Sequence, residues 1–363
     1  MVFGGRSSEH AISCVTAGSV LAAIDREQYD VVPVGIATDG RWVLESGDSD
    51  RLRLESADRL PSVDGDRASI ALARAADSTD LVVTEPAQPP RTLGEVDVVF
   101  PLLHGPWGED GTIQGMFEMA GVRYVGAGVL ASAISMDKVF MKIVLAAAGL
   151  PVVPGVVVTA TEWGQDPQRC RERAGALGYP LFAKPARGGS SIGISKVHDA
   201  AELDDAVTEA LRHDPKVLVE VAAVGAREIE CGVLQALDGG PETSLPAEVR
   251  VGGDHEFYDF AAKYLPEEHT QLDVPAVLPD GVAEELRALS ARAFEAVGCE
   301  GLARVDFFFH ESDGSLVVNE INTMPGFTPT SMFPRMWAAT GLDYPALIDR
   351  LLQLALARGT GLR

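Results

Sequence analysis

Two segments near the C-terminus carry acidic and amide side chains at a spacing that suits a divalent cation. The run 303–309 contains Asp306, and the run 316–322 contains Glu320 and Asn322. A Ser-Asp-Gly turn separates these two apolar runs, which predicts a β-hairpin. A hairpin that is symmetric about its central aspartate places position 306 opposite position 320. Because side chains alternate along a strand, the three polar side chains then share one face.

Carboxylates that face each other across a sheet repel, and a divalent cation between them removes that repulsion. Carboxylate and amide oxygens suit Mg²⁺ that is bound together with nucleotide phosphates. The alternative is that Asp306, Glu320 and Asn322 are ordinary solvated residues of an acidic protein. Phe307 and Phe309 lie on the opposite face and predict that this face is buried. We therefore favour a metal site on the polar face.

Lys184 ends an apolar run and leads into the glycine- and serine-rich loop 185–193. Such a loop can lay backbone N–H groups and hydroxyls against phosphate oxygens. Its spacing differs from GxxxxGK[ST], so the loop is not a P-loop. A flexible hairpin tip is the alternative, and the preceding lysine favours phosphate binding.

Two further turns have the composition of ligand-binding loops. In the run 4–10, GGRSSEH, a glycine pair lets a ligand approach the backbone at the start of a helix. This run lacks the GxGxxG dinucleotide pattern, and a plain helix cap at Ser7 or Ser8 explains it equally well. The run 104–111 begins with His104 directly after a predicted strand, where open α/β sheets bind their ligands.

The elements that must position these residues form three groups along the chain. In the N-terminal third, strands at 31–36 and 96–100 and a helix at 10–23 indicate an open α/β sheet, whereas residues 45–95 are interpreted as surface excursions. A second unit begins near Ser135 with a helix, and its predicted short strands are 156–158, 181–184, 193–197 and 217–220. The third unit has predicted strands at 228–237, 245–250, 305–309 and 316–321, and helices around 282–297 and 347–354.

The composition restricts the class of protein. The chain has 363 residues, of which 46% are hydrophobic, and a formal net charge of -23. This length suits two or three compact units, and the negative charge disfavours nucleic acid and anionic membranes as partners. The four cysteines are widely spaced, no basic-then-apolar leader opens the sequence, and no apolar run could cross a bilayer. We therefore expect a cytoplasmic protein.

Seven segments in the same order resemble the D-alanine–D-alanine ligase family of the ATP-grasp superfamily. They are GGRSSEHAIS (4–13), HGPWGEDG (104–111), SMDK (135–138), KPARGGSSIG (184–193), YDFAAKY (258–264), ARVDFFF (303–309) and NEINTMPGFTPTSMFP (319–334). The resemblance implies an α/β protein, α+β in its C-terminal half, with an ATP-grasp fold behind an N-terminal open, Rossmann-like domain. The implied boundaries are 1–134 for the substrate-binding domain, 135–224 for the central ATP-grasp domain and 225–363 for the C-terminal ATP-grasp domain.

The resemblance also implies how ATP is held. Lys138 and Lys184 would bind its phosphates, Glu220 the adenine amino group and Glu228 the ribose. Lys263 would reach the γ-phosphate from the loop 258–264, which would close over the site. Asp306, Glu320 and Asn322 would hold two Mg²⁺ ions, for which Mn²⁺ can substitute, and a monovalent cation is left open. The hinge 221–225 lacks the aromatic residue that some members carry, and the first strand is shorter than in the family.

The implied reaction joins two D-alanine molecules through an acyl phosphate, with release of ADP and phosphate, for peptidoglycan precursor synthesis. Glu9 would hold the amino group of the first D-alanine and, with Ser190 and Tyr264, would form a hydrogen-bonded set. Arg304 and the backbone N–H of Gly326 would stabilise the oxyanion. The implied substrate-binding residues are Glu9, His104, Arg304, Ser331 and Met332.

Four alternatives stay open. The second substrate could be D-lactate, although Tyr264 argues against a depsipeptide-forming enzyme, or the chain could be another ATP-grasp carboxylate–amine ligase. A nicotinamide oxidoreductase is disfavoured by the absent GxGxxG pattern. A nucleotide-binding module without catalysis is disfavoured because every polar position that the mechanism needs is occupied. Relatives in this family are commonly homodimers, so we expect a homodimer.

Overall fold

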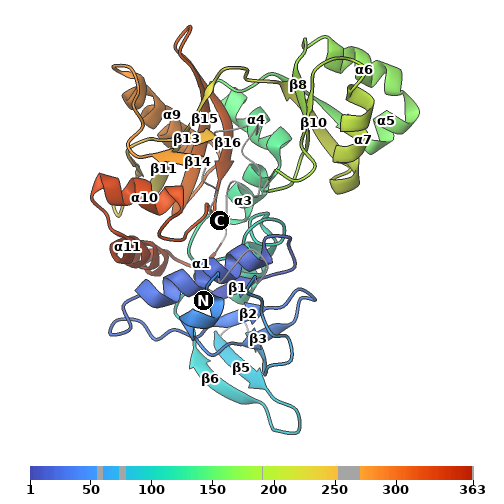
Figure 1. Cartoon of the computed structure of the whole chain (residues 1–363). Helices are drawn as coiled ribbons and strands as arrows, with labels where there is room; N and C mark the ends of the chain where they lie inside the picture. The colour runs from blue at the N-terminus through green and yellow to red at the C-terminus, as the bar shows by residue number, and fades with distance from the viewer. Residues whose placement is uncertain (55–59, 73–78, 190, 252–269, 362–363) are drawn as a thin grey trace.

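The structure is a computed structural model of the whole chain. It describes residues 1–54, 60–72, 79–189, 191–251 and 270–361. Three parts follow one another along the chain. The blue N-terminal part occupies one end of the molecule, and the green central sheet and the orange-red C-terminal sheet lie side by side at the other end (Figure 1). No helix in the described ranges is long and apolar enough to cross a membrane.

The N-terminal part is a six-stranded sheet with the order β1-β2-β3-β4-β5-β6. Its elements are β1 (Val2–Gly4), α1 (His10–Ala23), β2 (Val34–Ile36), β3 (Trp42–Leu44), a 3-10 helix (Ser49–Leu52), β4 (Ser69–Leu72), β5 (Asp80–Thr84), β6 (Arg91–Glu95) and α2 (Thr112–Ala120). The helix expected at 10–23 is confirmed to the residue. The interpretation of 45–95 as surface excursions is wrong, because β4, β5 and β6 supply half of the sheet.

Only the first pair of strands in this sheet is parallel, and the later pairs are antiparallel. The expected strand 96–100 is reduced to isolated bridges, in which Val99 pairs with Tyr124 and Pro101 pairs with Val2. The backbone still runs parallel to β1 there, since Val2 N–H donates to Phe100 O at 2.9 Å and Leu102 N–H donates to Val2 O at 2.8 Å. The turn that starts at Gly4 and the loop that starts at His104 therefore leave the same edge together.

The central part combines two helices with a four-stranded antiparallel sheet of order β7-β10-β8-β9. Its elements are α3 (Val129–Met136), α4 (Lys138–Ala147), β7 (Gly155–Thr159), α5 (Ala160–Gln165), α6 (Pro167–Gly175), β8 (Leu181–Pro185), β9 (Ser195–Val197), α7 (Leu203–His213) and β10 (Lys216–Val221). Asp137 separates α3 from α4 and caps α4, since its carboxylate accepts from the N–H groups of Val139 and Phe140.

The C-terminal part is an antiparallel sheet of order β14-β13-β11-β15-β16, with β12 paired to β11. Its elements are β11 (Arg227–Gln235), β12 (Pro241–Thr243), β13 (Ala247–Val251), β14 (Thr270–Asp273), α9 (Val282–Ala296), β15 (Leu302–His310), β16 (Ser315–Asn322), α10 (Met332–Thr340) and α11 (Tyr344–Ala357). Phe307 and Phe309 are each 1% exposed, which confirms the buried face of the hairpin.

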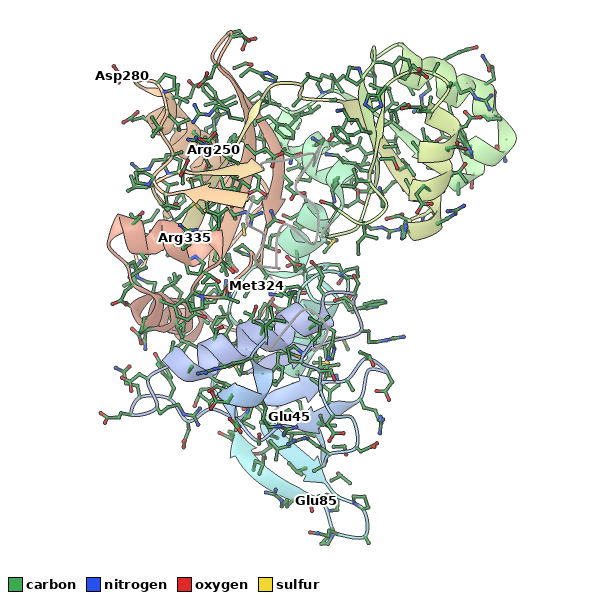
Figure 2. All side chains as sticks on the ribbon, in the orientation of Figure 1. Glu45, Glu85, Arg250, Asp280, Met324 and Arg335 are labelled. Atoms are coloured by element: carbon green, nitrogen blue, oxygen red, sulfur yellow. The ribbon has the colours of Figure 1, made fainter. Side chains whose placement is uncertain are left out.

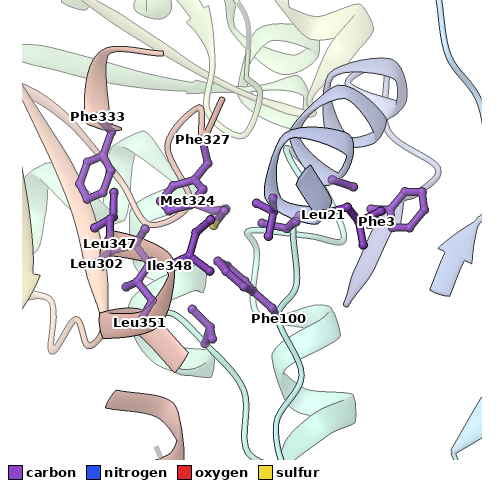
Figure 3. Close-up of a cluster of buried hydrophobic side chains, with 14 of the residues drawn as sticks. Phe3, Leu21, Phe100, Leu302, Met324, Phe327, Phe333, Leu347, Ile348 and Leu351 are labelled. Carbon is purple, nitrogen blue, oxygen red and sulfur yellow. The ribbon is translucent and has the colours of Figure 1, made fainter. Parts of the chain in front are cut away.

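One hydrophobic core joins the two ends of the chain. Phe3, Leu21 and Phe100 from the N-terminal part pack with Phe327 and Phe333 from the C-terminal part (Figure 3). Phe100 and Phe327 meet edge to face, with ring centroids 5.9 Å apart. This packing fixes the N-terminal turns against the segment that follows β16.

Candidate active site

The hairpin of β15 and β16 brings Asp306 opposite Glu320, as the sequence predicts. Between this pair and the turn, the register is shifted by one residue, because Phe307 pairs with Val318. Asn319 is therefore left without a cross-strand partner and forms a bulge beside the pair of Asp306 and Glu320. The Nδ2 atom of Asn322 donates to Asp306 at 3.1 Å, so the three residues expected to bind metal lie together.

Arg304 is held between two carboxylates beside this hairpin. Its Nε and Nη2 atoms donate to Asp306 at 2.7 and 2.6 Å, and its Nε lies 3.1 Å from Glu230 Oε2. Its side chain is 16% exposed, and the pKa of Arg304 is raised by Asp306 and Glu230 against the effect of burial. Glu230, which sequence reasoning missed, is thus the second partner of the arginine that was expected to stabilise the oxyanion.

Two adjoining cavities open on either side of Arg304. Lys138, Glu230, Arg304 and Glu320 line both of them. We call the cavity between the central and C-terminal sheets the hinge cavity; it is also lined by Lys184, Glu220, residues 221–226, Glu228 and Asp306. We call the other the turn cavity; it is also lined by Glu9, His104, Glu109, Asn322, Gly326, Ser331 and Met332.

Three buried charged residues contact one another at and behind the wall of the hinge cavity. Glu220 Oε1 lies 2.5 Å from Lys184 Nζ, and Glu220 Oε2 lies 3.0 Å from Lys142 Nζ. The three side chains are 2%, 11% and 9% exposed, respectively. The two ammonium groups lower the pKa of Glu220 despite its burial, and burial lowers the pKa of Lys142. One carboxylate therefore neutralises only one of two buried cations.

The glycine- and serine-rich loop is fixed to the central part by polar contacts. Lys138 Nζ donates to Gly188 O at 2.8 Å, and Arg187 makes a two-atom contact with Asp214 at 2.9 and 3.0 Å. The loop also reaches the N-terminal turn, because a Cβ atom built on Gly189 would lie 2.8 Å from Glu9 Oε2. Gly105, with a φ of 72°, approaches the same carboxylate, and a side chain there would overlap it.

The turn cavity joins the two N-terminal turns to the segment after β16. His104 Nδ1 lies 3.3 Å from the backbone oxygen of Met324. Met324 lies at the junction of the N-terminal and C-terminal parts (Figure 2). Burial lowers the pKa of His104, so its ring is neutral at pH 7. The hydroxyl of Ser331 lies 2.8 Å from that of Thr328. Glu9, His104 and Ser331 are therefore gathered around one cavity, as expected.

Comparison with known proteins now identifies the family. Two family models match, described as D-ala D-ala ligase N-terminus over residues 1–127 and D-ala D-ala ligase C-terminus over residues 144–353. A D-alanine–D-alanine ligase from Paenarthrobacter aurescens is 57% identical over 365 residues, which cover 100% of this chain and 96% of the relative. One from Kineococcus radiotolerans is 58% identical over 370 residues, which cover 100% of this chain and 97% of the relative.

The chain belongs to the D-alanine–D-alanine ligase family.

Solved structures of this ligase family have the same fold. A D-Ala:D-Ser ligase from Enterococcus faecalis superimposes with a TM-score of 0.82 at 32% identity, covering 98% of each chain. The D-alanine–D-alanine ligase of Coxiella burnetii has a TM-score of 0.80 at 34% identity, covering 98% of this chain and 93% of that one. The ATP-grasp fold implied by the sequence motifs is thereby confirmed.

The structure places most of the expected ligase residues around the two cavities. They are Glu9, His104, Lys138, Lys184, Glu220, Glu228, Arg304, Asp306, Glu320, Asn322, Gly326, Ser331 and Met332. Ser190, Lys263 and Tyr264 lie outside the described residues. Sequence reasoning missed Glu109, Lys142 and Glu230. For two of these residues the spacing in the sequence pointed to the site. Lys142 lies one helical turn after Lys138, and Glu230 alternates with Glu228 along one strand, so each pair shares a face.

Glu109 places a second carboxyl beside Glu9 in the ligase turn cavity. It accepts a hydrogen bond from Gly105 N–H at 2.5 Å. Burial and the neighbouring charge of Glu9 raise the pKa of Glu109 to about 8. The folded protein therefore binds more protons than the unfolded chain between about pH 4.5 and pH 8, so the stability that Glu109 contributes is lost as pH rises through this interval.

We expect Glu109→Gln to remove this pH dependence. At pH 5 the variant and the parent should have similar free energies of unfolding, and by pH 8.5 the variant should be relatively more stable, by roughly 4 kcal/mol. Urea unfolding at both pH values, with Glu118→Gln on α2 as the control, measures the difference. Parallel stability curves for the parent and Glu109→Gln would contradict the assignment.

Proposed function

We propose that this protein joins two D-alanine molecules in an ATP-dependent reaction that releases ADP and phosphate. The observation that carries this proposal is that the hinge cavity and the turn cavity meet at Arg304 and Glu320. The hinge cavity has the cationic wall that a nucleoside triphosphate needs, and the turn cavity has the carboxylate of Glu9, which suits an amino group. The full-length relatives named above support D-alanine as the substrate. Because the reaction consumes ATP, we propose that it takes place in the cytoplasm.

We propose that the hinge cavity binds ATP. We assign the adenine to the segment 221–226 with Glu220 at its amino group, and the ribose to Glu228. Lys138 and Lys184 both line this cavity, Lys138 also lines the turn cavity, and the two lysines would hold the phosphates. Lys263 is assigned to the γ-phosphate from the family resemblance. A cationic wall of this kind stabilises charge on a transferring phosphoryl group.

Asp306, Glu320 and Asn322 have the donor set of a divalent-cation site. Two carboxylates and one amide oxygen are hard ligands, and the facing pair of carboxylates calls for a counter-charge. In this structure Arg304 supplies that counter-charge to Asp306. When Asp306 binds a metal cation instead, Arg304 keeps Glu230 as its partner. We propose that two Mg²⁺ ions, or Mn²⁺ in their place, bind here and offset charge on the phosphate oxygens.

The proposed reaction then has two steps. A carboxylate oxygen of the first D-alanine forms a bond to the γ-phosphorus, and the bond from that phosphorus to ADP breaks. The amine of the second D-alanine then attacks the acyl carbon, loses a proton, and displaces phosphate. Arg304 and the N–H of Gly326 stabilise the oxyanion of this second step, Glu9 holds the first amino group, and Ser331 and Met332 bound the second subsite.

The assay for this function measures ADP and dipeptide together. The protein is incubated with ATP, Mg²⁺ and D-alanine, and we expect one ADP for each D-alanyl-D-alanine formed. L-alanine is the control for stereochemistry, and D-lactate and D-serine, offered with D-alanine, test the second subsite. ADP release that does not depend on D-alanine would overturn the proposal. Light scattering and a K⁺ titration in the same buffer test the proposed homodimer and a monovalent-cation requirement.

A further inference from the structure

We infer that Lys142, which lies behind the cavity wall, is a positioning residue that allows Lys184 to leave Glu220 for a nucleotide phosphate. The inference rests on the proposed function, because it assumes that the hinge cavity binds an adenine nucleotide. From the sequence, Lys142 had no expected catalytic, nucleotide-binding or metal-binding role.

The geometry of the three side chains separates a lysine in the cavity wall from a lysine behind it. Among the described residues, the wall of the hinge cavity includes Lys184 and Glu220 but not Lys142. Lys142 extends from α4 and contacts the Glu220 oxygen that Lys184 does not contact, at 3.0 Å. Glu320 on β16 also acts on both lysines, and Glu228 on β11 acts on Lys184. Of these two lysines, Lys184 is the one that lines the described part of the hinge cavity and can contact a ligand there.

Charge balance explains why two lysines share one carboxylate. Glu220 and Lys142 form a neutral buried pair by themselves, so the charge of Lys184 is not required to neutralise Glu220. A phosphate oxygen can therefore take Lys184 while Glu220 keeps a partner. Without Lys142, the same movement would leave Glu220 as a buried carboxylate without a counter-charge, which is strongly unfavourable. Lys142 thus lowers the free energy required to bind phosphate without contacting the nucleotide.

A purely structural role for Lys142 makes a different prediction. If its only task were to pack α4 against the central sheet, its loss would distort the whole hinge cavity. Binding of adenosine, which has no phosphate, would then weaken as much as binding of ADP. If Lys142 acts through Lys184, the loss should fall on the phosphate-bearing ligand alone.

The test compares ADP with adenosine by calorimetry in the presence of Mg²⁺. For Lys142→Met we expect the Kd of ADP to rise about tenfold or more, while the Kd of adenosine changes less than about threefold. Lys142→Arg, which keeps the charge, should bind ADP with a Kd near that of the parent. Adding Glu220→Gln to Lys142→Met removes the buried charge that Lys184 would abandon, so the ratio of the ADP Kd to the adenosine Kd should return toward the parent value.

Each outcome decides between the possibilities. Equal losses for ADP and adenosine, or a double variant whose ratio stays as high as that of Lys142→Met, would overturn the inference while the proposed function stands. A parent protein that binds no ADP would instead refute the nucleotide site itself. If Lys142→Met does not fold by circular dichroism, Lys142→Gln replaces it, and a parent-like ADP to adenosine ratio in that variant refutes the inference.

Discussion

Replacing Glu320 with Gln is expected to lower kcat by about 10²- to 10³-fold. Glu320 faces Asp306 across the hairpin and lines both cavities, so its carboxylate lies where the nucleotide and the amino acid would meet. The substitution preserves shape and removes one ligand charge. It should also weaken Mn²⁺ binding in a titration followed by electron paramagnetic resonance, which does not depend on turnover.

Asp313→Asn at the tip of the same hairpin is the matched control. Asp313 accepts a hydrogen bond from Ser315 N–H at 2.9 Å and is exposed, so the control changes an acidic residue on the hairpin far from the cavities. Folding of Glu320→Gln should be intact, because the substitution relieves repulsion between two facing carboxylates. A variant with parent-like kcat and Mn²⁺ affinity would remove Glu320 from the metal site.

Replacing Arg304 with Met is expected to reduce both activity and stability. The guanidinium group is buried between Asp306 and Glu230, and its removal leaves these carboxylates without their counter-charge. Breaking a buried ion pair in this way costs about 3–5 kcal/mol of unfolding free energy. In the folded variant, the loss of one hydrogen-bond donor to the oxyanion should lower kcat by a factor of about 10²–10³. Urea unfolding and steady-state kinetics measure the two effects separately.

A double substitution distinguishes charge balance from chemistry at this position. Adding Glu230→Gln to Arg304→Met should recover part of the stability and none of the activity, because it removes one unpaired carboxylate without replacing the donor. Arg292→Met on α9 is the control for loss of an arginine, since Arg292 contacts only the carbonyls of Ala148 and Gly149 among the hydrogen bonds recorded for it. Recovery of activity in the double variant would contradict the oxyanion role.

The sequence predicted the metal-ligand hairpin for a reason that is only partly right. It correctly paired Asp306 with Glu320 from the position of the turn. The bulge at Asn319 was not predictable, because a bulge depends on neighbouring tertiary contacts. One such contact is visible: the thioether of Met141 on α4 accepts a hydrogen bond from Ile321 N–H at 3.4 Å, between two expected metal ligands.

Other parts of the fold gave weaker sequence signals. Residues 80–95 form two strands, but their side chains alternate little in polarity, and β6 is exposed along its whole length. Periodicity therefore could not distinguish them from loops. Lys142 and Glu230 carried a periodic signal, yet a lysine or glutamate at such a position is normally solvated. Only the packing of α4 and β11 against the cavities shows that these charges are buried.

The transfer of one oxygen atom tests the central claim most directly. D-alanine labelled with oxygen-18 in its carboxylate is incubated with the protein, unlabelled ATP and Mg²⁺, and the released phosphate is analysed by mass spectrometry. A reaction through an acyl phosphate transfers one labelled oxygen to phosphate for each dipeptide formed. We expect this one-to-one ratio. Dipeptide formation with unlabelled phosphate would contradict carboxylate activation by phosphoryl transfer, and so would labelled D-alanine that yields no dipeptide.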